Sequence, residues 1–229
     1  ISAKIGDRTA VYDNFFRYKT QLNVSTIAGV RGNINYFTGG PLATATFGDI
    51  IGITVDNLGN TFVAMNSGNP RGLARVNETE NVAAWVSNDV PGKGQFRAPT
   101  IDPRTQIVYV PTDGGQSYLE LNPINLWIPR VREIVSYEPT PEEIANGDRK
   151  LFLNYKHSFA YCPWDNQIYS RSWGGIIGKF DPQSRVGRFV IDDGQPEVES
   201  YLAFDPLEPH MMYLCFQHRQ CIYRMDVSK

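Results

Sequence analysis

The sequence predicts an all-β protein in which four-stranded antiparallel sheets are arranged as the blades of a β-propeller. Three observations lead to this prediction. Short apolar segments alternate with turn residues, a hairpin-forming sequence returns about every 45 residues, and a second marker follows each hairpin at a nearly constant distance. Short, evenly spaced strands are typical of sandwiches, barrels and propellers. A repeat of this length favours the propeller, because each blade is one supersecondary unit.

Each repeat contains a hairpin that turns at an anchor residue. A short apolar strand leads to the anchor, a turn of four or five residues follows, and a second apolar strand completes the hairpin. The anchors are spaced 46, 60 and 43 residues apart, and the long interval contains an insertion near residues 137–150. The anchors are Asp56, Asp102, Cys162 and Asp205. We expect the three aspartates to cap their turns rather than to act in catalysis, because the same residue type recurs from repeat to repeat.

A second marker, with the pattern charged–apolar–Asn/Asp, follows every anchor. It ends at Asn77, Asn122, Asp181 and Asp226, which lie 21, 20, 19 and 21 residues after the respective anchors. The pattern predicts a third strand that ends in a turn in which the Asx side chain bonds the backbone. Fourth strands are expected at 82–86, 128–135 and 186–191. One such sheet cannot bury both of its faces alone, so radial stacking of the sheets is the expected arrangement.

The repeats divide the chain into blades at about 47–88, 96–136, 156–193 and 199–229, which together with a strand at 23–29 form a propeller over 21–229. The last blade lacks its fourth strand, and the strand at 23–29 could complete an incomplete blade. Taken literally, the units close a four-bladed ring. We prefer a six-bladed parent ring of which some blades are absent from this sequence. Residues 1–20 fit either the end of a preceding immunoglobulin-like domain or a partial first blade.

One part of the chain resembles the NHL repeat. Residues 24–29 read VSTIAG, residues 39–47 form a loop rich in Gly and Pro, and residues 52–64 read GITVDNLGNTFVA. The resemblance covers residues 24–66, although Met65 and Asn66 replace the usual Ala-Asp ending. The later repeats keep the hairpin and lose the Gly-Asn turn. The resemblance implies a propeller that usually has six blades.

Residues 7–18 (DRTAVYDNFFRY) resemble the closing strands of an IPT/TIG immunoglobulin-like domain. Proteins that place such a domain before an NHL propeller resemble surface lipoproteins of Gram-negative bacteria that serve glycan or peptide uptake. This resemblance implies a place at the cell surface or outer membrane, held only through a lipid anchor that this sequence does not contain. The implied partners are a glycan, a peptide or another envelope protein.

The composition argues against several other classes of function. The chain has 22 basic and 24 acidic residues, and this balance disfavours a nucleic-acid groove. No apolar run approaches the ~18 residues of a membrane span. No CxxC pair and no histidine pair at ligand spacing occur, so a zinc site is not expected and no cofactor is predicted. A calcium site built from Asp, Asn and Glu remains open. Cys215 and Cys221 could form a disulfide across a hairpin, although buried thiols are the favoured interpretation.

A ligand is expected on the face built by the loops that join strands two to three and strands four to one. Trp173 in such a loop could stack on a sugar ring or on a peptide group while polar neighbours fix its orientation. Ordinary polar turns are the alternative interpretation. His157, which precedes a first strand, could face the central channel. The candidate binding residues are Asn66, Asn69, Arg71, Asp113, Gln116, Trp173, His218 and Arg219.

The sequence therefore predicts a non-catalytic binding or scaffold module of a bacterial nutrient-uptake system. No Ser-His-Asp spacing, nucleophile elbow or phosphate loop is found. The alternative is a propeller enzyme of the lactonase or lyase type with a metal in the central channel. A third possibility, an intracellular NHL domain that binds protein or RNA, is disfavoured for RNA by the near-neutral charge.

Overall fold

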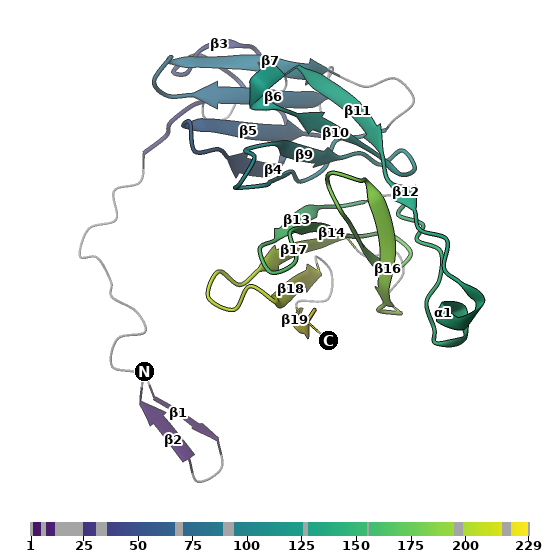
Figure 1. Cartoon of the computed structure of the whole chain (residues 1–229). Coiled ribbons are helices and arrows are strands. Elements are labelled where there is room, and N and C mark those ends of the chain that lie inside the picture. Colours follow the sequence, from purple (N-terminus) through teal and green to yellow (C-terminus); the bar gives the residue numbers. More distant parts are fainter. Residues whose placement is uncertain are drawn as a thin grey trace.

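A computed structural model describes residues 2–5, 8–11, 25–30, 36–66, 71–88, 94–125, 128–154, 156–194, 199–216 and 221–228. Four antiparallel sheets are arranged as the four blades of a β-propeller, which confirms the predicted fold class. Figure 1 shows these sheets following one another along the chain. A separate two-stranded sheet is formed by β1 (Ser2–Ile5) and β2 (Arg8–Val11).

In each blade the strands follow one another in chain order, from the first strand near the centre of the propeller to the last strand at its rim. Blade 1 consists of β4 (Ile50–Val55), β5 (Asn60–Met65), β6 (Gly72–Asn77) and β7 (Val82–Asn88), with the short β3 (Gly40–Pro41) at its outer edge. Blade 2 consists of β8 (Thr100–Ile101), β9 (Val108–Pro111), β10 (Ser117–Leu121) and β11 (Pro129–Glu133). A 3₁₀ turn at Pro123–Asn125 precedes β11.

Blade 3 consists of β13 (Phe159–Cys162), β14 (Gln167–Arg171), β15 (Ile176–Phe180) and β16 (Val186–Asp192), and β12 (Val135–Ser136) pairs in parallel with β16. Blade 4 has three described strands, β17 (Ser200–Phe204), β18 (Met211–Phe216) and β19 (Cys221–Asp226). The insertion before blade 3 contains α1 (Pro141–Ala145), which Thr140 and Glu143 stabilise through a capping box.

The expected strand at 23–29 is not formed in its described part, because residues 25–30 belong to no strand. They lie against blade 1 instead. Gly29 N donates a hydrogen bond to Leu42 O at 3.0 Å, and Ala28 packs on the apolar cluster of that blade. This segment therefore covers one face of blade 1 rather than extending another sheet.

The hairpin turns have the hydrogen bonds of Asx turns. Asp56 Oδ1 accepts from Leu58 N (2.9 Å) and Asn60 N (2.7 Å), and Asp205 Oδ1 accepts from Leu207 N (2.8 Å). In blade 3, where Cys162 occupies the anchor position, Asp165 Oδ1 accepts from Gln167 N at 3.1 Å instead. The second markers form equivalent turns, with acceptors on Asn77, Asn122, Asp181 and Asp226.

Apolar side chains fill the space between successive blades. Between blades 2 and 3, Tyr118 packs on Phe180 with ring centroids 5.2 Å apart, and Phe159 lies 5.3 Å from Phe180. A second cluster joins blades 1 and 2 around Phe62 and Leu119, and a third joins blades 3 and 4. Each sheet thus buries a face against its neighbour, as the propeller requires. The cysteines Cys162, Cys215 and Cys221 are free thiols.

We predict that Asp102→Ala lowers the free energy of unfolding by about 1–2 kcal/mol, because it removes the hydrogen bonds that a buried carboxylate accepts at this turn. Asp102 is 1% exposed, and its carboxylate accepts from Arg104 N (2.9 Å) and from the Arg104 guanidinium (2.9 and 3.1 Å). Urea denaturation measures the change. Asp205→Ala, at a more exposed turn, serves as the milder comparison. Unchanged stability of Asp102→Ala would contradict the turn-capping role.

Candidate functional site

The loops that join strands two to three and strands four to one lie at one end of the blades, because every blade is an antiparallel meander that runs outward. Asn66, Asp113 and Trp173 follow second strands at this end, and residues 94–99, 156–158 and 199 precede first strands there. Of the candidate binding residues, Asn69, His218 and Arg219 lie outside the described residues. Five candidates can therefore be placed.

Two of the five, Arg71 and Gln116, make no hydrogen bond or ion pair with the other candidate binding residues in the described part of the chain. Arg71 is exposed beside the start of β6. Gln116 uses both ends of its amide within the fold. Its Nε2 donates to Ser136 Oγ at 2.5 Å, and its Oε1 accepts from Leu153 N at 3.4 Å. Gln116 thus links blade 2 to the segment that leads into blade 3.

Asp113 forms a bidentate ion pair with a residue that the sequence did not indicate. Arg97 Nε lies 2.7 Å from Asp113 Oδ1, and Arg97 Nη2 lies 3.1 Å from Asp113 Oδ2. Arg97 Nη1 also lies 3.5 Å from Glu199 Oε1, at the start of blade 4. Burial lowers the pKa of Arg97, but hydrogen bonding and attraction to Asp113, with further attraction to Glu199, raise it above its ordinary value. The two parallel hydrogen bonds therefore hold the Arg97 guanidinium and the Asp113 carboxylate in a fixed orientation.

Two buried ionisable residues precede β13. Lys156 is fully buried, and its Nζ donates to Gly115 O and to Leu153 O. Burial lowers the pKa of Lys156 to about 7, against the opposing attraction of Asp113. His157 is 3% exposed, and burial together with the charges of Arg97 and Arg171 lowers its pKa to about 4. His157 is therefore neutral at physiological pH.

The His157 ring packs against the ring of Trp173. The two ring centroids are 5.4 Å apart, with an interplanar angle of 37°. Trp173 is 38% exposed, and its backbone N–H donates to Asn154 O at 3.3 Å. Within the described part of the chain, His157 Nε2 and Asn66 Oδ1 are buried and have no hydrogen-bond partner. An exposed aromatic ring thus packs against a buried imidazole whose Nε2 has no hydrogen-bond partner among the described residues.

A second bidentate pair connects this region to blade 4. Arg171 is fully buried, and its Nε and Nη2 lie 2.5 and 3.0 Å from the carboxylate oxygens of Asp193. Its guanidinium lies 4.9 Å from the centroid of the Phe216 ring. The arginines of both Arg–Asp pairs lower the pKa of His157 through their charge. We name the set Arg97, Asp113, Lys156, His157, Trp173 and Glu199 the inner-loop cluster.

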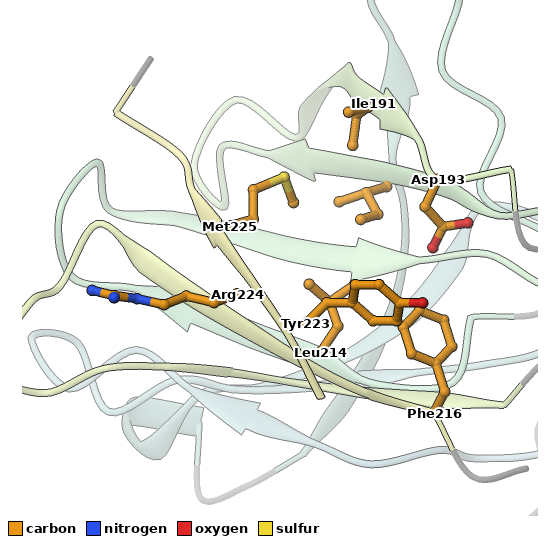
Figure 2. Close-up of a pocket in the computed structure, with 8 residues that line it drawn as sticks. Ile191, Asp193, Leu214, Phe216, Tyr223, Arg224 and Met225 are labelled. Atoms are coloured by element: carbon orange, nitrogen blue, oxygen red, sulfur yellow. The ribbon is translucent and has the colours of Figure 1, made fainter. Parts of the chain in front are cut away.

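A pocket of about 280 Å³ opens between blades 3 and 4, next to the Arg171–Asp193 pair. Figure 2 shows the Asp193 carboxylate and the Tyr223 hydroxyl at the right of this pocket, Met225 at the left and Ile191 above. The Tyr223 ring meets Phe216 edge-on at 5.1 Å. The pocket is lined by Ile177, Ile191, Asp193, Leu214, Phe216, Tyr223, Arg224 and Met225.

The sequence indicated only part of this site. It identified Asp113 and Trp173, and it noted that His157 could face the channel. It missed Arg97, Lys156 and the Arg171–Asp193 pair. Arg97 and Lys156 lie in the loops before first strands, and Asp193 follows a fourth strand. The available signal was a basic residue three positions before the first strand in both blade 2 and blade 3. Among the described residues, no group of three or more His, Cys, Asp or Glu could hold a metal ion.

Comparisons with known proteins show the fold alone. No known protein family matches the chain, and no curated protein matches it. Similar solved structures include auxiliary nutrient binding proteins from Bacteroides thetaiotaomicron (13% identity, TM-score 0.66) and Bacteroides ovatus (13%, 0.64), each aligned over 88% of this chain. A protein from Bacteroides thetaiotaomicron provisionally named a phosphatase aligns over 98% of this chain (12%, 0.65).

The chain spans about half the length of these solved structures, with 44%, 45% and 54% of their residues covered. The NHL and IPT/TIG resemblances stay predictions, because no family match supports them. In the described part of the chain, no helix has the length and apolar character needed to cross a membrane.

We predict that acid destabilises the protein partly through His157. The unfolded chain takes up a proton on this histidine near pH 6.5, whereas the folded protein does so only near pH 4. The unfolded state therefore binds more protons in this window, and the free energy of unfolding falls as the pH decreases from 6.5 to 4. His157→Phe lacks this contribution. Its free energy of unfolding, measured by urea denaturation, should therefore fall less steeply than that of the wild type as the pH decreases from 6.5 to 4. If the free energy of unfolding changed equally with pH in the wild type and in His157→Phe, that result would contradict the buried, neutral state of His157.

Proposed function

We propose that the chain is a non-catalytic ligand-binding propeller, and that its ligand, a glycan or a peptide, binds on the inner-loop cluster. The observation that carries this proposal is the exposed ring of Trp173, which packs against the buried imidazole of His157. An aromatic face with a few fixed polar groups around it is typical of sites that orient a ligand with both an apolar and a polar side.

The polar groups around Trp173 suit recognition without a large net charge. The inner-loop cluster contains Arg97, which two carboxylates neutralise, and Lys156, whose pKa is lowered to about 7. Ion-paired side chains of this kind present donors and acceptors in fixed directions, as hydroxyl and amide groups of a ligand require. The cluster therefore favours a neutral polar ligand over a highly charged one.

The setting of this binding is part of the same proposal. We propose a nutrient-uptake role at the cell envelope of a Gram-negative bacterium, with another envelope protein as the alternative partner to a glycan or peptide. The names of the Bacteroides nutrient binding proteins that share the fold support this setting. The finer assignments, a six-bladed NHL parent and a preceding IPT/TIG domain, rest on the sequence resemblance at residues 24–66 and 7–18.

The test begins with an array of glycans and peptides and continues with calorimetric titration of the best ligand. Trp173→Ala should weaken binding by about tenfold or more, the loss expected for an aromatic contact at the centre of a site. Its melting temperature should stay close to that of the wild type, because Trp173 is partly exposed.

The matched control is Trp164→Ala. Trp164 is also exposed, at 57%, but it lies in the turn between the first and second strands of blade 3, at the other end of the blade. The affinity of Trp164→Ala for the same ligand should remain within about twofold of that of the wild type. Equal losses in both variants, or a loss confined to Trp164→Ala, would show that the ligand does not bind on the inner-loop cluster.

A further inference from the structure

Lys156 connects two blades through the carbonyl groups that it contacts. Its side chain is fully buried. The Nζ atom donates to Gly115 O, in the loop between β9 and β10 of blade 2, and to Leu153 O, 3.4 Å away, in the segment that leads into blade 3. Among the described residues, these two carbonyl oxygens are the acceptors that Nζ reaches. Lys156 therefore holds the blade 2 loop against the start of blade 3.

The two acceptors match the donors of an uncharged amine. A lysine ammonium has three N–H donors, whereas the uncharged amine has two. A proton on Lys156 would bury a charge together with a donor that has no acceptor among the described residues, and such burial costs free energy. This donor count agrees with the burial that lowers the pKa of Lys156 to about 7. Lys156 therefore exchanges its proton near neutral pH.

Asp113 is the charged group that acts on Lys156, and it raises the pKa of Lys156 against the effect of burial. The Asp113 carboxylate pairs with Arg97, which in turn contacts Glu199. On the other side lies His157, whose own pKa of about 4 keeps it neutral between pH 6 and 8. A proton gained by Lys156 thus adds a positive charge that competes with Arg97 for the Asp113 carboxylate.

The loop at 113–116 has the backbone freedom to respond to this charge. Gly114 and Gly115 directly follow Asp113, and Gly115 has a φ of 55°. Glycine adopts this left-handed region readily and gives the chain several alternative conformations. Because Lys156 contacts the carbonyl oxygen of Gly115, its hydrogen bond acts on the loop two residues away from the Asp113 carboxylate.

We propose that Lys156 is a positioning residue for the inner-loop cluster: the uncharged amine holds the loop at 113–116 in the arrangement that binds ligand, and protonation in mild acid draws Asp113 away from Arg97 and weakens binding. The protein then binds its ligand at neutral or mildly alkaline pH and releases it in acid. The inference rests on the proposed function for the ligand, whereas the movement of the loop can be measured without one.

The first experiment follows the amide resonances of Gly114 and Gly115 by NMR from pH 5.5 to 8.5 in the absence of ligand. In the wild type both should shift with a midpoint near pH 7, because the loop senses the proton on Lys156. Lys156→Met has no titrating group at this position and should lack the midpoint. The matched control Lys150→Met, which removes an exposed lysine, should retain it.

Two results of this titration would overturn the proposal. One is the absence of a midpoint near pH 7 in the wild type, and the other is a midpoint that persists in Lys156→Met, which would assign the titration to another group. Circular dichroism checks that Lys156→Met folds. If it does not, Lys156→Gln replaces it, because the glutamine amide keeps two N–H donors and does not titrate.

The second experiment is calorimetric titration of the best ligand from the array at pH 6 and at pH 8. The affinity of the wild type should be about tenfold weaker at pH 6, since the uncharged fraction of Lys156 falls about tenfold between these pH values. Lys156→Met should bind equally at both. Equal affinity of the wild type at both pH values would overturn the proposal. If the array yields no ligand, the proposed function fails, and the amide titration still decides the role of Lys156.

Discussion

The contact between the apolar faces of neighbouring sheets is the interaction on which the rest of the structure depends. Tyr118 and Phe180 are fully buried in the contact between blades 2 and 3, and Phe62 and Leu119 are buried between blades 1 and 2. Each fully buried side chain of this size contributes roughly 1.5–3 kcal/mol. No blade buries both faces by itself, so the sheets stabilise one another in sequence. Ile53 in blade 1 and Ile222 in blade 4 are exposed, on sheets that each have one described neighbouring blade.

The same packing brings distant loops together at one end of the blades. Arg97 precedes blade 2, Asp113 follows its second strand, and Glu199 precedes blade 4, yet the three form one ion-paired group. His157 lies beside residue 98 across the blade boundary, because Ala98 N donates a hydrogen bond to His157 O, and the charges of Arg97 and Arg171 both lower its pKa. Rigid sheets hold the loop residues in place, and the loops supply the chemistry.

The repeat made the fold predictable. The anchors and the Asx markers at constant offsets indicate turns, and a turn depends only on residues that are close in the sequence. The turns at Asp56 and Asn77 have the expected hydrogen bonds. The site was less predictable, since pairing of Arg97 with Asp113 depends on how two loops meet in space. The segment at 25–30 illustrates the same limit. Its strand-like sequence indicates a β-conformation, but packing on blade 1 decides where it lies.

The most direct test of the binding surface is fluorine NMR of protein labelled at its four tryptophans. Trp173 lies on the inner-loop cluster, whereas Trp164 lies in a turn at the other end of blade 3 and packs against His210. Titration with a glycan or peptide that binds the protein should shift the Trp173 resonance and leave the Trp164 resonance in place. Saturation without any change at Trp173 would contradict the account.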